Sequence, residues 1–290
     1  TDNNIGGKSA VGEKFADVFN NFAVYIGVVS SSHAVKGAVA SALKGKMELA
    51  REKSVAKLSF HIGATNDNVE EICRLIKEGD DKTGITPDDI AGVKVFMGSS
   101  TGNMLLDSGD TLDKLFAIKE KPVLVHCEDE ATIKENLAKA IETYGEEIPF
   151  REHENIRSRK ACIKSSIKAL ELAIKHGTRR VLCHISTKEE VEMVRAAKLN
   201  NPDIIAETSC NDLWFTNEDY DRLGSRVKCN PSVKTANDRE ALREALAAGT
   251  IDTIGSDHAP HLLTEKQWQI SRKWEVERGI HQRSLTKMQK

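Results

Sequence analysis

The sequence predicts a parallel α/β fold, a TIM-type (β/α)8 barrel, on three observations. Seven short β-branched or aromatic runs alternate along the 290 residues with charged segments of helical spacing. The runs are apolar throughout, as in parallel strands that helices cover on both faces. Ionisable residues fall in or at the carboxyl ends of four runs. The seven runs are residues 22–30, 58–64, 93–98, 122–127, 180–186, 203–209 and 252–256.

Helical segments follow the second, fourth and fifth runs, at residues 67–79, 130–145 and 187–200. In the last of these, Thr187 has the position of an N-cap and Glu190, three residues on, that of its capping-box partner. The alternation of strand and helix also fits an open, doubly wound sheet. The two folds differ in where they place polar residues at strand ends.

Four such residues are Lys94, His126, His184 and Asp257, which belong to four different runs. A barrel brings the carboxyl ends of all its strands to one mouth, whereas an open sheet spreads them along an edge. The chain also has no Gly-x-Gly-x-x-Gly turn for a nucleotide. We therefore favour the barrel and expect the four side chains to converge at one of its ends.

Each of these residues has an ordinary structural explanation when taken alone. A histidine near the end of an apolar strand is often held by a backbone carbonyl, and a lysine in a strand usually extends its amine to solvent. Asp257 in TIGSDHAPH has the residue type of a helix N-cap. One lysine, two histidines and one aspartate at separate strand ends together favour a metal site.

The composition excludes several classes of protein. The 42 basic and 44 acidic residues nearly balance, so no basic footprint for nucleic acid or an anionic membrane exists. No apolar run has the length of a membrane span, and the N-terminus lacks the order of a secretory signal. We expect a cytoplasmic protein with a small-molecule partner.

The six cysteines are scattered, mostly inside or at the ends of apolar runs, and none forms a Cys-x-x-Cys pair. We interpret them as reduced core residues, because free cysteine packs like a small hydrophobic side chain.

Several stretches, taken in order, resemble the dihydroorotase family of the amidohydrolase superfamily, from about residue 42 to residue 266. They are SFHIGATNDN, GVKVFMGSSTGNML, LVHCEDE, RVLCHIST, DLWFTNEDYDRLG, VKCNPSVKT and GSDHAPHLLTEK. The resemblance implies a (β/α) barrel with two Zn²⁺ ions. It also implies a cyclic amide as substrate, dihydroorotate or its open form N-carbamoyl-aspartate.

The resemblance assigns a role to each residue at the strand ends. Lys94 resembles the lysine that is carboxylated and bridges both zinc ions, and carboxylation would remove a buried positive charge. His126 and His184 resemble ligands of the second zinc, and Asp257 resembles both a ligand of the first and the general base.

Further residues of the resemblance concern the substrate. His261 resembles the histidine that binds the substrate carboxylate, and Asn230 resembles an asparagine that contacts the ring. For His258, a supporting role and a direct contact both stay open.

The chain also departs from the family. No His-x-His pair occurs, so we expect the first barrel strand to be missing from a barrel domain over residues 1–266. Asn211 and Asp212 stand where the family has paired histidines, and residues 267–290 form a charged tail of helical character. With these ligands absent, we expect this stretch of chain to hold one zinc weakly or none.

Three hypotheses follow. The chain is a dihydroorotase lacking part of its sequence, an inactive dihydroorotase-like scaffold or partner protein, or a related cyclic amidohydrolase such as an allantoinase or dihydropyrimidinase. A seven-stranded barrel has two open edges, so we also expect a homodimer or larger assembly.

Overall fold

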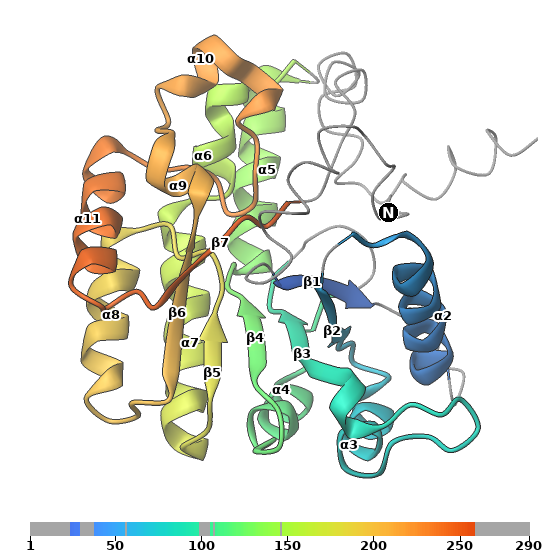
Figure 1. Cartoon of the computed structure of the whole chain (residues 1–290). Coiled ribbons are helices and arrows are strands. Elements are labelled where there is room, and N and C mark those ends of the chain that lie inside the picture. Colours follow the sequence, from blue (N-terminus) through green and yellow to red (C-terminus); the bar gives the residue numbers. More distant parts are fainter. Residues whose placement is uncertain are drawn as a thin grey trace, which may run out of the picture. The chain divides into compact units, whose positions relative to one another are not determined.

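The structure is a computed structural model that describes residues 24–29, 38–55, 57–98, 105–106, 108–145 and 147–258. The described strands and helices alternate as the sequence predicts (Figure 1). The strands are β1 (Val24–Val29), β2 (Lys57–Gly63), β3 (Ile90–Phe96), β4 (Val123–His126), β5 (Arg180–Leu182), β6 (Ile204–Ser209) and β7 (Thr253–Gly255).

The helices connect successive strands. The longer ones are α2 (Ala38–Lys53), α3 (Val69–Glu78), α4 (Gly109–Phe116), α5 (Glu130–Tyr144), α7 (Arg159–His176), α8 (Lys188–Lys198) and α11 (Ala236–Ala247). The shorter ones are α6 (His153–Ile156), α9 (Cys210–Trp214) and α10 (Asp219–Leu223), with 3₁₀ turns η1 (Pro87–Asp89), η2 (Phe150–Glu152) and η3 (Gly224–Arg226). No helix among the described ranges is long and apolar enough to cross a membrane.

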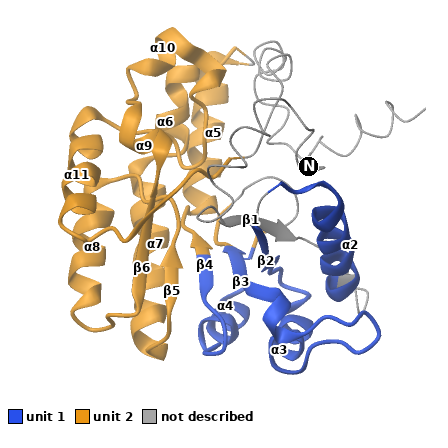
Figure 2. Ribbon diagram, viewed as in Figure 1, with its two compact units in different colours: residues 1–95, 106–124 blue, residues 96–105, 125–290 orange. Residues whose placement is uncertain are grey.

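Two compact units make up the chain (Figure 2). Unit 1 comprises residues 1–95 and 106–124, and unit 2 comprises residues 96–105 and 125–290. The tail at residues 267–290 lies outside the described residues, so its helical character and the boundary at residue 266 stay predictions.

Unit 1 contains a parallel ladder in which β1 pairs with β2 and β2 with β3. A register shift falls between Phe60 and His61, after which Gly63 pairs with Lys94. A Cβ at Gly92 would lie 2.8 Å from the His61 ring and 2.7 Å from the Pro122 carbonyl, so only glycine fits there. The buried core of unit 1 includes Leu43, Ile62, Ile72, Leu75, Val93, Val95, Leu112, Leu115 and Phe116.

Unit 2 contains a second parallel ladder, in which β5 pairs with β6 and β6 with β7. In both units the strands lie side by side in chain order, as the barrel predicts. Strand β7 is mostly exposed, with Ile254 at 50% of its full exposure, so the prediction that the runs are covered on both faces is wrong for this strand. The reason is that only β6 covers an edge of β7 among the described residues.

The capping box predicted at Thr187 is confirmed. The Glu190 backbone N–H donates to Thr187 Oγ1 over 3.2 Å, and the Thr187 N–H donates to Glu190 Oε2 over 3.2 Å. All six cysteines are free, as expected. Cys127, Cys162 and Cys183 are buried, whereas Cys210 is exposed because it begins the short surface helix α9, so its assignment to the core was wrong.

Helices α7 and α11 both pack against α8 in unit 2 (Figure 1). One carboxylate, that of Asp238, interacts with residues of all three helices. Asp238, 1% exposed, accepts bonds from the Arg159 guanidinium at 2.7 and 2.5 Å and from the Lys188 N–H at 3.0 Å. Burial by itself raises the pKa of Asp238, but these donors and Thr235 outweigh it and lower that pKa to about 2. The carboxylate therefore stabilises the packing of three helices.

We expect Asp238→Asn to lower the free energy of unfolding by about 2 kcal/mol, as is typical when a hydrogen bond to a charged group is lost. Since the pKa of Asp238 is depressed by folding, its contribution is full above the unfolded value near 4 and is lost as the pH falls towards about 2. Urea unfolding as a function of pH measures both effects. Glu240→Gln on the same helix, where the side chain is 52% exposed, is the control and should change stability little. Equal stability of the two variants at neutral pH would contradict the expectation.

Candidate active site

Two buried histidines face each other in unit 2. His126 is the last residue of β4, and His184 lies two residues after β5; both are under 5% exposed. His126 Nδ1 lies 3.0 Å from His184 Nε2, and the ring centroids are 4.7 Å apart in an edge-to-face arrangement. The structure therefore brings together two of the four residues that the sequence predicts to converge, and their role as metal ligands stays a prediction.

A buried ion pair orients His126. Its Nε2 lies 2.9 Å from Glu128 Oε2, and the same carboxylate is paired with the Arg157 guanidinium. Burial by itself raises the pKa of Glu128, but Arg157 and then His126 outweigh it and hold that pKa well below its usual range. An ionised Glu128 accepts a hydrogen bond from the Nε2–H group of His126, and the unprotonated Nδ1 then directs its lone pair at His184.

Close backbone packing holds Glu128 in this place. A Cβ on Gly98 would lie 2.2 Å from the Glu128 carbonyl oxygen, so only glycine allows this approach. The Met97 N–H also donates to the His126 carbonyl over 3.0 Å. The chain after β3 therefore packs directly on the turn after β4.

His184 and Asp257 share an unusual backbone conformation. They are the non-glycine residues with positive φ among the described residues, at 38° and 41°. This left-handed region is disfavoured for residues with a side chain and is found mostly where the surrounding structure holds a functional group in place. The turn at His184 also ends β5 at Leu182, short of the predicted residue 186. Both residues thus leave their strands through constrained turns.

A small recess in unit 2 gathers three of the predicted site residues, His184, Asn230 and Asp257. Its volume is about 10 Å³, which is room for about one water molecule. The other residues that line it are Ser209, Asn211, Asp212, Cys229 and Pro231. Asp257 is exposed in the described structure, and His258 is also exposed. His261 lies outside the described residues.

Lys94 lies in unit 1, on β3, and is 7% exposed. Its carbonyl accepts a bond from the Ala64 N–H over 2.8 Å. The buried His61 lies near enough to interact electrostatically with it: burial first, and then the Lys94 charge, lower the pKa of His61 to about 4. His61 is therefore a neutral imidazole near the buried Lys94. The sequence analysis did not indicate this role for His61.

Asp212 is a buried carboxyl that the sequence analysis did not assign to the site. It is 4% exposed and lines the recess with His184 and Asp257. Burial raises its pKa to about 7, against a hydrogen bond from Ser209 that lowers it. Its place beside LWFT, where the resemblance to dihydroorotases implies a histidine, is the signal that could have identified it.

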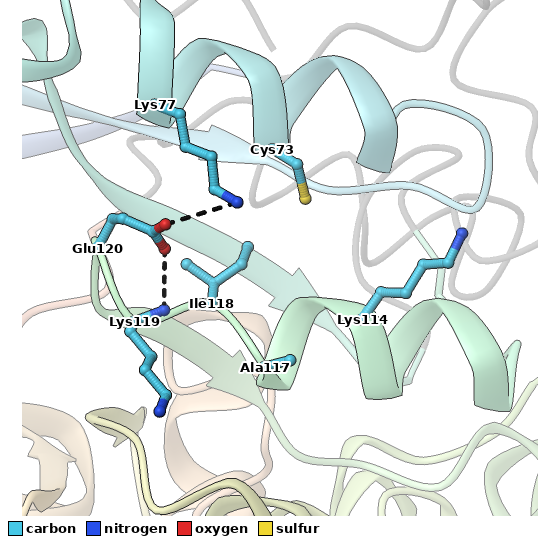
Figure 3. Close-up of a pocket in the computed structure, with 7 residues that line it drawn as sticks. All are labelled: Cys73, Lys77, Lys114, Ala117, Ile118, Lys119 and Glu120. Carbon is cyan, nitrogen blue, oxygen red and sulfur yellow. Dashed lines mark hydrogen bonds and ion pairs between the residues drawn. The ribbon is translucent and has the colours of Figure 1, made fainter.

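Unit 1 has a separate recess, shown in Figure 3, with none of the predicted site residues. Its lining includes Cys73, Lys77 and Glu120, and Lys77 Nζ lies 3.6 Å from Glu120 Oε1. Burial raises the pKa of the Cys73 thiol, which disfavours the nucleophilic thiolate. We assign no chemistry to this recess.

The histidine pair fits the donor set of zinc. Two imidazole nitrogens bound to one tetrahedral zinc at about 2.0–2.1 Å lie about 3.4 Å apart, close to the 3.0 Å between His126 and His184. The carboxylate of Glu128 behind His126 is the partner that zinc-binding histidines commonly have. The described residues contain no group of three histidine, cysteine or acidic side chains that could hold one ion.

Solved structures define the class of fold. The chain is similar to a dihydropyrimidinase from Brevibacillus agri, with 21% identity, 89% of this chain and 54% of that chain covered, and a TM-score of 0.75. The L-hydantoinase from Arthrobacter aurescens has 22% sequence identity and a TM-score of 0.76. The match covers 91% of this chain and 56% of that chain. The chain therefore has the (β/α) barrel fold of the amidohydrolase kind, as predicted, and the described residues form part of that barrel. No family model matches the chain.

Related sequences identify the family within this class. A dihydroorotase from Methanosarcina mazei is 32% identical over 230 residues, 76% of this chain and 47% of the relative. A dihydroorotase from Methanosarcina acetivorans is 31% identical over 234 residues, which are 78% of this chain and 47% of the relative. The chain belongs to the dihydroorotase family, which confirms the resemblance in its motifs. It spans about half the length of these relatives.

We expect Glu128→Gln to lower the free energy of unfolding by about 3 kcal/mol, because it removes the charge from a buried ion pair with Arg157. Urea unfolding at pH 7 measures the effect. Glu135→Gln is the matched control. That carboxylate is 64% exposed and forms an ion pair with Lys139, four residues on along the same helix, and such surface pairs contribute little to stability. A loss no larger than in the control would show that the Glu128 charge does not support the fold.

Proposed function

We propose that this chain forms the barrel part of a zinc-dependent dihydroorotase, which interconverts N-carbamoyl-L-aspartate and L-dihydroorotate. The observation that carries the proposal is the His126–His184 pair, oriented by Glu128, in a chain of the dihydroorotase family. The left-handed backbone at His184 and Asp257 supports it, because such constrained positions concentrate at functional sites.

In this proposal, His126, His184 and Asp257 are zinc ligands, together with Lys94 in its carboxylated form. In carboxylation the Lys94 ammonium loses one proton, and the resulting amine bonds to the carbon of carbon dioxide and loses a second proton, which would convert a buried cation into an anionic oxygen donor. The bound metal supplies a Lewis acid that polarises the amide carbonyl and acidifies the attacking water.

Asp257 acts as the general base. Its carboxylate accepts a proton from the water that adds to the ring carbonyl carbon, and it returns the proton to the ring nitrogen as the carbon–nitrogen bond breaks. Its exposed position at the recess leaves it open to substrate and water. Asn230 contacts the ring, and His261 binds the substrate carboxylate.

The proposal also includes a homodimer or larger assembly in the cytoplasm and no nucleic-acid or membrane partner. Support for the small-molecule substrate comes from the family alone. The alternative is a catalytically inactive scaffold, which absence of dihydroorotate hydrolysis in the following experiment would favour.

We expect Asp257→Asn in the natural protein to lower turnover of dihydroorotate by at least about 10²–10⁴-fold, since the amide cannot accept the proton. Hydrolysis is followed by ultraviolet absorbance with zinc and bicarbonate supplied, and zinc content is measured in parallel. Asp221→Asn, at a carboxylate that is 72% exposed, is the matched control. Full activity of Asp257→Asn, or no hydrolysis by the wild type, would overturn the enzymatic proposal.

His261→Ala should act on substrate binding instead. Loss of a hydrogen bond to a charged group weakens affinity by roughly 10- to 150-fold, while zinc content stays at the wild-type level. The measurements are KM for dihydroorotate and bound zinc. A loss of zinc with an unchanged KM would assign His261 to the metal rather than to the substrate.

A further inference from the structure

One turn of helix in unit 2 serves two parts of the candidate site. His153 begins α6, and Arg157 follows it four residues later, the spacing at which side chains share one face of a helix. Arg157 pairs with Glu128, which orients His126. His153 instead contacts the segment that contains Asn230. Nothing in the proposed reaction uses His153, although its ring is fully buried.

His153 donates a hydrogen bond to the peptide group that joins Cys229 to Asn230. Its Nε2 lies 2.8 Å from the Cys229 carbonyl oxygen. Because a carbonyl oxygen is only an acceptor, the ring carries its proton on Nε2. Burial first, and then the charges of Lys228 and Arg157, hold the pKa of His153 well below its usual range, so the ring is neutral and has one N–H group. The single donor of this ring is therefore committed to the backbone beside Asn230.

Core packing fixes the orientation of the His153 ring. Tyr220, which is 1% exposed, meets it edge to face, with the ring centroids 5.9 Å apart and the ring planes at 75°. The Tyr220 hydroxyl accepts a hydrogen bond from the Val233 backbone N–H over 3.2 Å. Tyr220 and Val233 also belong to one buried hydrophobic cluster with Val227. The imidazole therefore has little freedom to turn away from the Cys229 carbonyl.

The same turn also holds the other side of Asn230. The Ser232 hydroxyl donates to the Arg157 carbonyl oxygen over 2.9 Å, and Ser232 is fully buried. Residues 229 and 232 are thus both bonded to the turn at residues 153–157, with Asn230 between them. Asn230 is only partly buried, and its side-chain oxygen has no hydrogen-bond partner among the described residues. These two attachments therefore set where the Asn230 amide lies.

We propose that His153 is a positioning residue for Asn230: its Nε2–H group holds the Cys229 carbonyl and thereby places the amide that contacts the substrate ring. The inference rests on the proposed function, because it explains how Asn230 is held at that same site. It assigns His153 no contact with the substrate or the metal and no part in the chemical step.

The first test uses the natural protein without substitution. NMR with isotopically labelled histidine nitrogens should show His153 as the neutral tautomer protonated at Nε2 between about pH 6 and pH 8. The signal is identified by its absence from His153→Gln. A ring protonated at Nδ1 instead would overturn the inference, because it could not donate to the Cys229 carbonyl.

The second test separates the hydrogen bond from the fold. In His153→Gln the amide nitrogen reaches the place of Nε2 and can donate to the Cys229 carbonyl, whereas the shorter side chain in His153→Asn ends near the place of Nδ1. Calorimetric binding of orotate measures ring affinity without turnover, since orotate keeps the carboxylate and the ring N–H and carbonyl groups of dihydroorotate. His153→Asn should bind orotate roughly two- to tenfold more weakly, the usual effect of one neutral hydrogen bond, and His153→Gln should restore the wild-type affinity.

Bound zinc should stay at the wild-type level in both variants, and thermal melting establishes that each is folded. Asp221→Asn, at a carboxylate that is 72% exposed, is the control and should leave the affinity unchanged. If His153→Asn does not fold, the tautomer measurement decides.

A double-mutant cycle tests whether His153 acts through Asn230. Asn230→Ala should weaken binding of orotate by itself. Adding His153→Asn to Asn230→Ala should then change the affinity little, because the amide that His153 places is already absent.

Additive effects of His153→Asn and Asn230→Ala would overturn the inference, as would wild-type affinity in a folded His153→Asn or failure of the wild type to bind orotate. Loss of zinc from His153→Asn would also overturn it, since His153 would then support the metal ligands. Failure of the proposed function is distinguishable. A protein that shows the coupling but hydrolyses no dihydroorotate retains the positioning role of His153 and loses the catalytic assignment, whereas hydrolysis without the coupling does the reverse.

Discussion

The described part of the site depends on one buried carboxylate, Glu128. It lies between the Arg157 guanidinium and the His126 ring, and its charge is stabilised because the positive partner is buried with it. This charge fixes the tautomer and the direction of His126, and His126 in turn faces His184. A buried charge of this kind is strongly destabilising without its partner, so the position of the imidazole is tied to the stability of unit 2.

Left-handed turns complete the placement. His184 and Asp257 follow β5 and β7 at positive φ, and both side chains line the recess. Asn230 and Asp212 reach the same recess from the segment before α11 and from α9. Within unit 2, the recess therefore brings together one imidazole, two carboxyl groups and a side-chain amide.

Asp212 combines a structural role with a place beside the recess. It bonds to Ser209 at the start of α9, and its other carboxylate oxygen is buried without a hydrogen-bond partner among the described residues. Because burial raises the pKa of this carboxyl to about 7, its charge is sensitive to pH near neutrality.

The sequence by itself determined the order of strands and helices, the capping box at Thr187 and the family, because apolar periodicity, caps and short motifs are local properties of the chain. It also identified His126 and His184 by their places at strand ends. The tertiary structure alone decided that Glu128 and Arg157 support His126, that Asp212 joins the recess, and that Cys210 and β7 are exposed. These facts depend on contacts between residues that are far apart in the sequence. Such contacts decide which side chains are buried, whereas periodicity is a property of neighbouring residues.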